Sequence, residues 1–481
     1  MNNIKPYKKY KASGIEWLGD IPEHWEVRKL KYNADILNGY AFKSDEYKDI
    51  GVPIVRIGDL KNENFVNITG KYVSGEFKEI AKSFIIQKFD ILVALTGATI
   101  GKSSIYKHSE IALLNQRVGL IRNKPEFNQH FLQKIIASDA FLEHVKLECG
   151  GSAQENIGKP ELSNFLIQTP PPPEQTAIAN FLDYKTAKID RFIRKKKQLI
   201  KLLNEQKAAI INDAVTKGLN PKTKMKPSGV EWLGDIPEHW EVRRIGVFGR
   251  FSKGGGISRA ELLPEGKAAI LYGDIYTKYN FEAKNIINRV SEETANNSIK
   301  LEIGDLLLTG SGETKEDIGK CIAFLSEEDT YAGGDVIIFK QNDNDSLFLS
   351  YALNSKGAVY QKILSAKGDI IVHIYGSKLK NIRIPIPPLS EQKLIVSHIQ
   401  KETATLNTTI ATIEKEIALV QEYRTALIAE AVTGKIDVRE YCLNQDVEGL
   451  EDEQDFEEEN ADTIENRELN IAAEMEGKYG T

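Results

Sequence analysis

The sequence is poor in the residues and patterns that mark several protein classes. Its 481 residues include three cysteines, Cys149, Cys321 and Cys442, which lie far apart and form no CxxC pair, so neither a disulfide framework nor a zinc site is expected. No apolar run approaches the roughly 18 residues that span a bilayer. The start "MNNIKPYKKY" also lacks the apolar core of a signal peptide. These features predict a cytoplasmic protein with free thiols.

Catalytic motifs are equally scarce. The stretch "GATIGKS" (97–103) resembles a phosphate-binding loop, but three residues separate its glycines where that loop needs four. There is no HExxH or HxxxH pair, no GxSxG elbow, and no tetrapeptide of the kind that amino-methyltransferases use. The sequence therefore predicts a chain that binds and positions but does not catalyse, with no metal or cofactor of its own.

Charge is distributed unevenly along the chain. The net charge is −6, but residues 441–481 hold fourteen acidic and two basic residues, a local balance of −12. The remaining 440 residues carry 61 basic and 55 acidic groups, a balance of +6. This pattern predicts a solvated, disordered acidic tail on a mildly basic body. The tail is either a solubilising extension or an intramolecular competitor for a basic surface.

One sixteen-residue phrase occurs twice. "SGIEWLGDIPEHWEVR" (13–28) and "SGVEWLGDIPEHWEVR" (228–243) differ at one position, and together they contain all four tryptophans. Further matches follow in the same order at nearly the same offset: Gly58-Asp59 with Gly273-Asp274, "FDILVALTG" with "GDLLLTG", Gly101-Lys102 with Gly319-Lys320, "PPPPEQ" with "PPLSEQ", and "AVTKG" with "AVTGK". The chain therefore consists of two tandem copies of a unit of about 215 residues, with the acidic tail appended.

Each copy has a mixed part and a helical part. Short β-branched runs between glycine turns, together with a helical stretch at 127–147, predict a mixed α/β (α+β) domain. After the proline runs, residues 174–217 and 390–433 contain neither proline nor glycine and keep apolar residues at three/four spacing, which predicts two helices of about 65 Å. Because the first helix leads into the second domain and the other returns, we expect an antiparallel pair and a pseudo-twofold dumbbell.

Two features of these segments allow alternative interpretations. Centre-to-centre pairing would set the basic run 191–201 beside Glu414 and Glu416, which favours interhelical ion pairs over a stripe for the DNA backbone. The duplicated phrase would dock each domain against its helix or present one surface twice to a partner. We take its tryptophans as candidates for partner binding, with core packing as the alternative: Trp17, Trp25, Trp232 and Trp240.

The tandem layout resembles the specificity subunit of Type I restriction–modification systems. The resemblance covers residues 1 to about 440 and rests on the repeated openings, the "GD[IL]L…TG" segments, and the "PPPPEQ" or "PPLSEQ" entries into long helices. It implies two target-recognition domains that each read one half of a split DNA sequence, with the coiled-coil helices as ruler. It also implies docking of two methyltransferase subunits, which bring S-adenosylmethionine, and of a translocating restriction subunit, in DNA methylation and antiviral defence.

The resemblance implies the following domain limits. They are a first target-recognition domain at 1–166, a long central helix at 167–218, a second target-recognition domain at 219–384, a long C-terminal helix at 385–437, and the acidic tail at 438–481.

The loops that differ between the copies are the candidates for sequence readout. Major-groove readout uses donor and acceptor side chains on loops, and backbone contacts use basic and hydroxyl residues. An ordinary solvated loop is the alternative for each residue. The candidates in the first copy are Lys43, Ser44, Arg56, Thr99, Lys102, Ser103, Gln154 and Asn156. Those in the second copy are Lys253, Ser258, Arg259, Tyr272, Thr314, Lys315, Lys367, His373 and Tyr375.

Two other functions fit the same layout. One is a two-headed protein–protein scaffold that never binds DNA, and the other is a DNA-binding adaptor of another defence complex. DNA affinity that falls steeply with salt would separate the DNA-binding hypotheses from the scaffold.

Overall fold

The computed structural model describes residues 5–441 except 63–64, 67, 69, 150–155, 313, 316 and 369–371. The chain divides into two compact units, unit 1 (Met1–Ile193 with Ile417–Thr481) and unit 2 (Arg194–Glu416). Most of the predicted acidic tail thus lies outside the described residues. The division cuts both long helices, so each unit contains one mixed domain and parts of two helices, whereas the predicted limits separate domains from helices.

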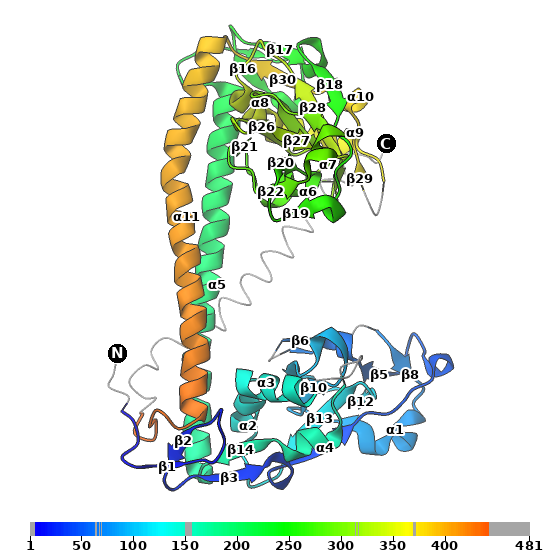
Figure 1. Ribbon diagram of the computed structural model, residues 1–481, viewed down its shortest axis with the longest axis vertical. Coiled ribbons are helices and arrows are strands. Elements are labelled where there is room, and N and C mark those ends of the chain that lie inside the picture. Colours follow the sequence, from blue (N-terminus) through cyan, green and yellow to red (C-terminus); the bar gives the residue numbers. More distant parts are fainter. Residues whose placement is uncertain are drawn as a thin grey trace. The chain divides into compact units, whose positions relative to one another are not determined.

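In unit 1, two sheets form the mixed domain (Figure 1). The first is antiparallel, in the order β11-β10-β13-β4: Ser103–Ile105, Ile91–Ala94, Val118–Asn123 and Ala34–Asn38. The second has the order β8-β5-β12-β9: Tyr72–Val73, Val52–Val55, Ala112–Leu114 and Ile85–Ile86. Its central pair β5–β12 is parallel and its other pairs are antiparallel. The central strands β5, β10 and β12 read as continuous apolar runs because both of their faces are buried.

Unit 2 repeats this design with longer sheets. The first has the order β18-β28-β24-β26-β21: Arg250–Lys253, Val336–Lys340, Leu306–Thr309, Cys321–Phe324 and Glu282–Ala283. The second has the order β19-β22-β20-β27-β23: Leu262–Leu263, Asn288–Val290, Lys267–Ile270, Thr330–Ala332 and Ile299–Lys300. Its central pair β20–β27 is again parallel. The mixed α/β class predicted from the alternating runs is confirmed in both copies.

Smaller elements complete each unit. In unit 1 they are the strand pairs β1–β2 (Tyr10–Ala12, Asp20–Pro22), β6–β7 (Leu60–Asn62, Phe65–Val66) and β3–β14 (Glu26–Lys29, Leu166–Thr169), and the helices α1 (Phe77–Ile80), α2 (Gln129–Ile136), α3 (Asp139–Glu148) and α4 (Lys159–Asn164). In unit 2 they are β15–β16 (Met225–Pro227, Asp235–Pro237), β17–β30 (Glu241–Arg244, Arg383–Ile386), β25–β29 (Ser311–Gly312, Val372–His373), α6 (Tyr272–Thr277), α7 (Glu292–Asn296), α8 (Ser346–Leu353), α9 (Lys356–Ser365) and α10 (Gly376–Leu379).

The two long helices are α5 (Pro172–Lys217) and α11 (Leu389–Val432). Proline suits the first position of α5 because that residue needs no amide hydrogen-bond partner. Both helices end before a glycine in the left-handed region, Gly218 (φ 73°) and Gly434 (φ 72°), as expected for a C-terminal cap. The glycine in the repeated "AVTKG" and "AVTGK" segments therefore terminates each helix.

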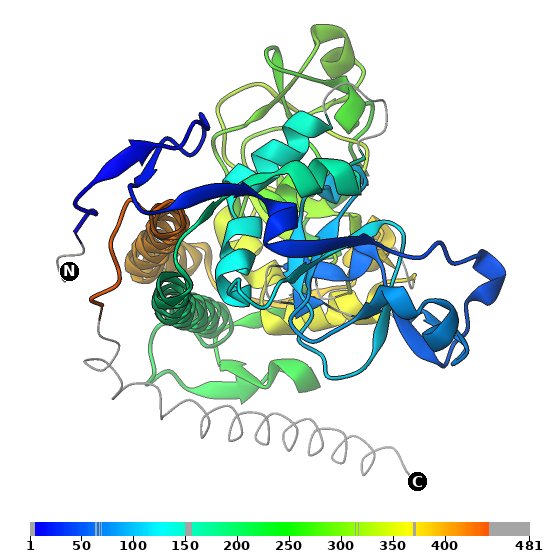
Figure 2. The same ribbon diagram turned by 90° about the horizontal axis from the view of Figure 1, so that it is seen from below.

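Within each unit α5 and α11 lie side by side and run antiparallel (Figures 1 and 2). In unit 1, Arg424 of α11 pairs with Asp190 of α5 (Nε–Oδ1 3.4 Å). In unit 2, the Lys196 ammonium lies 2.8 Å from Glu416 Oε2, which confirms the predicted ion pair between the basic run and the acidic stretch of α11. The predicted apolar seam of α11 is buried or half-buried at Ile399, Leu406, Ile410, Ile413, Ile417, Val420, Leu427 and Ala431. None of the described helices is long and apolar enough to cross a membrane.

Candidate nucleic-acid interface

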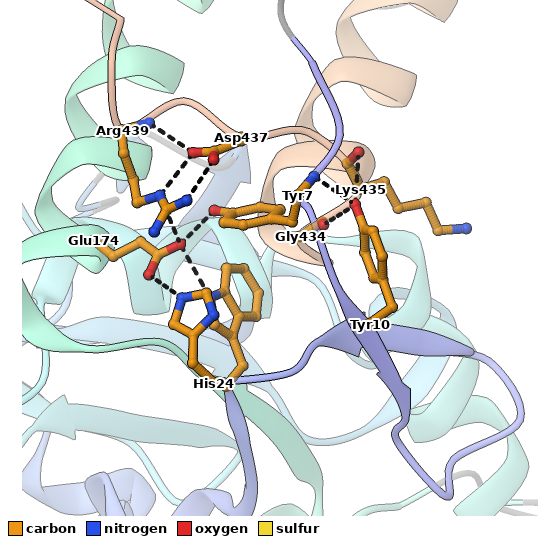
Figure 3. Close-up of polar contacts among 9 residues, drawn as sticks. Tyr7, Tyr10, His24, Glu174, Gly434, Lys435, Asp437 and Arg439 are labelled. Atoms are coloured by element: carbon orange, nitrogen blue, oxygen red, sulfur yellow. Dashed lines mark hydrogen bonds and ion pairs between the residues drawn. The ribbon is translucent and has the colours of Figure 1, made fainter.

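The duplicated phrase docks each domain onto the start of a long helix. In unit 1, Glu174 in the first turn of α5 is 5% exposed and accepts hydrogen bonds from Trp25 Nε1 (3.1 Å), from the Tyr7 hydroxyl, and from His24 Nε2 (2.8 Å) (Figure 3). The Arg439 guanidinium lies 4.0 Å from the same carboxylate. Burial and the bond to Glu174 raise the pKa of Tyr7 above its usual range. The "EHW" of the phrase and the "EQ" at the helix start therefore form one contact.

Unit 2 has a reduced version of this contact. Glu391 in the first turn of α11 accepts a hydrogen bond from His239 Nε2 (2.8 Å), and its side chain is 26% exposed. The side chain of Trp240 is fully buried, but its Nε1 has no hydrogen-bond partner. The buried polar network of unit 1 is therefore absent around Glu391 in the described part of unit 2.

The glutamine of each "EQ" fixes a second element. Gln175 accepts a hydrogen bond from the backbone N–H of Asn128, the N-cap of α2 (2.8 Å), and donates to the Pro170 carbonyl (2.8 Å). Gln392 accepts in the same way from the N–H of Asp345, the N-cap of α8 (2.8 Å). One dipeptide thus ties the long helix both to the opening phrase and to the helical part of the domain.

The four tryptophans divide into two pairs. Trp25 and Trp240 are 0% exposed, so they pack within their own units and have no surface left for a partner subunit. Their assignment to partner binding is therefore corrected to core packing. Trp17 is 36% exposed and stacks on Phe165 (centroids 5.8 Å apart). Trp232 is half-buried against Gly357, where a β-carbon would lie 2.2 Å from its ring. A partner contact at Trp17 and Trp232 remains a prediction.

In unit 2 the candidate loops meet at a hollow of about 500 Å³. Strand β25 pairs with β29, which places Ser311 opposite His373, and the Ser311 hydroxyl lies 2.9 Å from His373 Nδ1. Lys253 at the end of β18 and the 59%-exposed Tyr375 line the same hollow. Folding therefore brings together three of the candidates, Lys253, His373 and Tyr375, from segments 120 residues apart.

The hollow presents both donors and acceptors. Lys253 Nζ lies 3.2 Å from Asp335 Oδ1, and both side chains are exposed. Next to Ser311, the Tyr276 hydroxyl hydrogen-bonds to Thr309 Oγ1 (2.7 Å), and burial raises the pKa of Tyr276 to about 12, so this phenol stays neutral. An aspartate can accept from the cytosine amino group, and a lysine can contact guanine or phosphate. Among the described residues no cluster of His, Cys, Asp and Glu could hold a metal ion.

Unit 1 builds the same junction from other residues. Thr96 forms an isolated β-bridge with Asn156, and the Ile157 amide donates to the Leu95 carbonyl (2.9 Å). The Ile374 amide donates to the Gly310 carbonyl (3.0 Å) in unit 2, so the two junctions are equivalent. Of the candidates nearby, Thr99 and Asn156 are exposed, Lys102 is half-buried, and Ser103 is buried in β11.

Equivalent positions of the two junctions carry different side chains. The Leu95 amide donates to the Arg117 carbonyl (3.0 Å), and the Gly310 amide donates to the Asp335 carbonyl (3.1 Å), so Arg117 occupies the place of Asp335. Both side chains are exposed. Neither was a candidate from sequence. The offset of 218 between "NQRVGLIR" and "GGDVIIFK" could have revealed the pair, because it aligns Val118 with Val336.

Several candidates occupy short capped turns. Lys43 and Ser258 are the N-caps of equivalent 3₁₀ turns, Ser44–Glu46 and Arg259–Glu261. Their backbone amides donate to Glu46 and Glu261, both at 2.7 Å, and the hydrogen bonds from Ser258 lower the pKa of Glu261. Lys43, Ser44, Ser258 and Arg259 are all exposed.

The remaining candidates lie at other places. Arg56 is the half-buried N-cap of the turn Ile57–Asp59 and lies 3.8 Å from the Asp59 carboxylate. Tyr272 is 41% exposed at the first position of α6, the equivalent element. Three further candidates are exposed on loops of unit 2: Thr314, Lys315 and Lys367. The Thr314 hydroxyl hydrogen-bonds to Asp317. Gln154 lies outside the described residues.

Comparisons with known proteins agree with this architecture. The model of the Type I restriction modification DNA specificity domain matches residues 22–202 and 237–419. The EcoBI specificity subunit of Escherichia coli is 25% identical over 459 residues, covering 90% of each chain. The MjaVIII specificity subunit of Methanocaldococcus jannaschii is 30% identical over 218 residues, 43% of this chain and 51% of that protein.

A solved structure shares the fold. It comes from work on complex assembly and conformational transition of the type I R-M system, with a TM-score of 0.61 at 15% identity over 86% of this chain and 98% of that one. The two matches of the family model cover about three quarters of the sequence, one in each copy of the repeat. The chain thus belongs to the Type I restriction–modification DNA specificity family, as a specificity subunit that recognises DNA and leaves catalysis to partner subunits.

Proposed function

We propose that the two domains read two different half-sites of one split DNA target. The observation that carries this proposal is the exchange of Arg117 for Asp335 at equivalent positions of the two junctions. Arginine is the commonest reader of guanine O6 and N7, whereas aspartate accepts from the cytosine amino group. Two copies of one fold that carry opposite charges at equivalent positions are expected to select different bases.

The surrounding positions differ in the same way. Asn38 ends β4 where Lys253 ends β18, and Thr96 with Asn156 takes the place of Ser311 with His373. By contrast, the docking contacts of Glu174 and Glu391 are held in common. This pattern fits a protein whose two copies dock on their long helices through the same contacts but read different bases.

The partners follow from the same division. We propose that the antiparallel α5–α11 pair fixes the spacing between half-sites, and that each copy docks one methyltransferase subunit, giving two per chain. S-adenosylmethionine would be bound by those subunits. The exposed Trp17 and the half-buried Trp232 belong to the repeated phrase, so they are the candidates for a contact made twice.

A domain exchange tests the bipartite model. Replacing residues 1–166 with the corresponding domain of another specificity subunit should change one half-site of the methylated motif and leave the other, as read by methylome sequencing with the cognate methyltransferase. A change in both half-sites would refute the assignment of one reader to each copy.

Two matched substitutions locate the readout. Arg117→Ala should relax recognition in the first half-site, and Asp335→Ala in the second, each by about 1–3 kcal/mol of discrimination at one base pair. Lys284→Ala, at an exposed residue just after β21 on the sheet edge opposite β18, serves as the surface control. Loss of affinity that is uniform over all sequences would instead identify phosphate contacts.

The scaffold hypothesis makes a different prediction. If the chain reads DNA together with its partners, affinity should fall steeply as salt rises, because counterions are released from phosphates. The scaffold hypothesis would be favoured if the chain bound protein partners only, with an affinity that neither DNA nor salt changes.

A further inference from the structure

Ser311 and His373 form a hydrogen-bonded pair at the hollow of unit 2. The antiparallel pairing of β25 with β29 sets them opposite each other, and the Ser311 hydroxyl lies 2.9 Å from His373 Nδ1. The backbone of His373 is held as well, because its amide donates to the Lys367 carbonyl (2.8 Å) and its carbonyl accepts from the Lys367 amide (3.0 Å). The imidazole is therefore fixed both through its backbone and through one ring nitrogen.

The hydrogen bond to Ser311 decides which state the other ring nitrogen takes. Ser311 is 9% exposed, and in the described part of unit 2 His373 Nδ1 is the hydrogen-bond partner of its hydroxyl. A buried hydroxyl group donates its hydrogen to an acceptor, so Nδ1 accepts and the proton of the neutral ring lies on Nε2. A charged ring carries protons on both nitrogens. His373 therefore presents an N–H donor at Nε2 in either state.

This donor is open to a ligand. Within the part of unit 2 that the structure describes, Nε2 makes no hydrogen bond, yet it is not sealed from solvent. His373 lines the hollow together with Lys253, Asp335 and Tyr375. A ligand atom that enters the hollow and can accept a hydrogen bond is thus matched by the free N–H of the ring.

Three side chains of the hollow form a set of two donors and one acceptor. Lys253 Nζ and His373 Nε2 are the donors, and the Asp335 carboxylate, 3.2 Å from Lys253 Nζ, is the acceptor. In the major groove a G·C pair presents the two acceptors of guanine, N7 and O6, followed by the amino group of cytosine. If Asp335 takes that amino group, the guanine acceptors remain for the two donors.

The first copy has a different pair at this place. Thr96 and Asn156 replace Ser311 and His373, and Asn156 is exposed. A carboxamide carries both a donor and an acceptor, which suits adenine N7 and N6 rather than two acceptors. The fixed imidazole donor is therefore a feature of the second copy, as expected if the copies read different bases.

We propose that His373 is a specificity-determining residue that donates from Nε2 to N7 or O6 of a guanine, and that Ser311 is the positioning residue that keeps this nitrogen a donor. The guanine is the partner of the cytosine that Asp335 contacts. This inference rests on the proposed function, because it requires that the second domain reads a half-site. It adds the identity of one base pair and the protein atoms that recognise it.

Base analogues in the second half-site test the contact atom by atom. With the motif known from methylome sequencing, each of its guanines is replaced in turn by 7-deazaguanine, which lacks N7, or by 6-thioguanine, whose sulfur is a weak acceptor. At one position, one of these analogues should weaken binding by the chain with its methyltransferase about tenfold. Inosine keeps both atoms and lacks the minor-groove amino group, so it serves as the control and should bind about as guanine does.

His373→Phe completes a double-mutant cycle with these analogues. Phenylalanine keeps a ring at this position but has no N–H, so the variant should bind the unmodified duplex about tenfold more weakly. On the analogue that weakens the wild type, the variant should lose nothing further, because the contact is already gone. Losses that add in full, or a second half-site without a G·C pair, would overturn the proposal.

Substitutions of Ser311 test its positioning role. Ser311→Ala removes the hydroxyl and should relax discrimination at that guanine, and Ser311→Thr, which keeps a hydroxyl on the strand, should restore it. The ring-nitrogen chemical shifts of His373, assigned with His373→Phe, should show the proton on Nε2 in the wild type and a mixture of tautomers in Ser311→Ala. A proton on Nδ1 in the wild type, or a loss in Ser311→Ala that is uniform over all sequences, would overturn this role.

An unrelated sequence in place of the second half-site separates the two levels of the argument. Unchanged affinity would show that the second domain reads no bases, and the proposed function would then fail together with the inference. A clear loss of affinity, with sensitivity to the analogues at no guanine, would refute the role of His373 and leave the proposed function standing.

Discussion

Lys362 of α9 is a buried lysine whose energetics can be measured. It is 1% exposed, and its ammonium donates to the Gly319 carbonyl (2.7 Å). Burial lowers the pKa of Lys362 from 10.5 to about 8, because the charged form loses its hydration. Lys362 packs against Gly319, because a β-carbon added to Gly319 would meet its side chain. A β-carbon added to Gly101, the equivalent glycine of the first copy, would meet Val145. The first copy therefore has a valine at the position of Lys362.

The shift fixes the sign of a pH effect. Below pH 8, Lys362 is protonated in both the native and the unfolded state. The buried charge then makes the free energy of unfolding about 3 kcal/mol lower than it is above pH 10.5, where Lys362 is neutral in both states. Between these values the unfolded state binds more protons than the native state, so stability rises with pH. From pH 7 to pH 9 the two pKa values give a gain of about 1.3 kcal/mol from this group alone.

The prediction concerns the difference between wild type and Lys362→Met. Methionine keeps the unbranched chain but cannot titrate, so the unfolding free energy of wild type minus that of the variant should rise by about 1.3 kcal/mol between pH 7 and 9. Burial also lowers the pKa of Lys320, and the subtraction removes the contribution of Lys320. Burial raises the pKa of Cys321 to about 12, but this thiol interacts with Lys362, so both proteins of the comparison should carry Cys321→Ala. Lys378→Met, at an exposed site, is the control.

Urea unfolding is a suitable assay. Fluorescence of Trp232 and Trp240 reports on unit 2 in a chain in which Trp17 and Trp25 are phenylalanine. A difference that is constant from pH 7 to 9, or that falls, would refute the claim that a charged lysine is buried there at a cost.

Three further outcomes are expected. Phe89 has a positive φ of 75°, which is unfavourable for a residue with a β-carbon, and the equivalent Gly304 has φ 96°. In urea unfolding, Phe89→Gly should therefore stabilise unit 1 by roughly 1 kcal/mol, and Gly304→Phe should destabilise unit 2 by at least as much. Glu174→Gln should cost about 2–4 kcal/mol and Glu391→Gln less than half of that, because three donors meet the buried carboxylate and one meets the half-exposed one; equal losses in calorimetry would contradict this account. Ile413→Pro should cost about 3 kcal/mol or more at the middle of α11, and undisturbed DNA recognition by the folded variant would count against the helix pair as a ruler.

Much of the architecture could be predicted because it follows from repeats and from patterns of neighbouring residues. The repeated phrases give the tandem copies, and the absence of proline and glycine over 174–217 and 390–433 gives the helices, which the structure places at Pro172–Lys217 and Leu389–Val432. The ion pair between Lys196 and Glu416 followed from the antiparallel register alone. Each of these depends on residues that are close in sequence or related by one constant offset.

The candidate interface could be predicted only as a set of loops. Lys253, His373 and Tyr375 share a hollow because β18, β25 and β29 converge there, and no local pattern states that convergence. Arg117 and Asp335 were missed because each lies beside a buried strand in a segment that reads as core. Trp25 and Trp240 were assigned to partner binding, although their burial shows that they pack inside their units.

The sequence by itself determined the duplication, the mixed α/β class, the two long helices and the family. It could do so because periodicity and repetition are properties of the order of residues. The tertiary structure alone decided which loop residues meet, which tryptophans are buried, and that Glu174 collects three donors where Glu391 has one. The physical reason is that side-chain contacts depend on strand pairing and burial between segments a hundred or more residues apart, which no local pattern encodes.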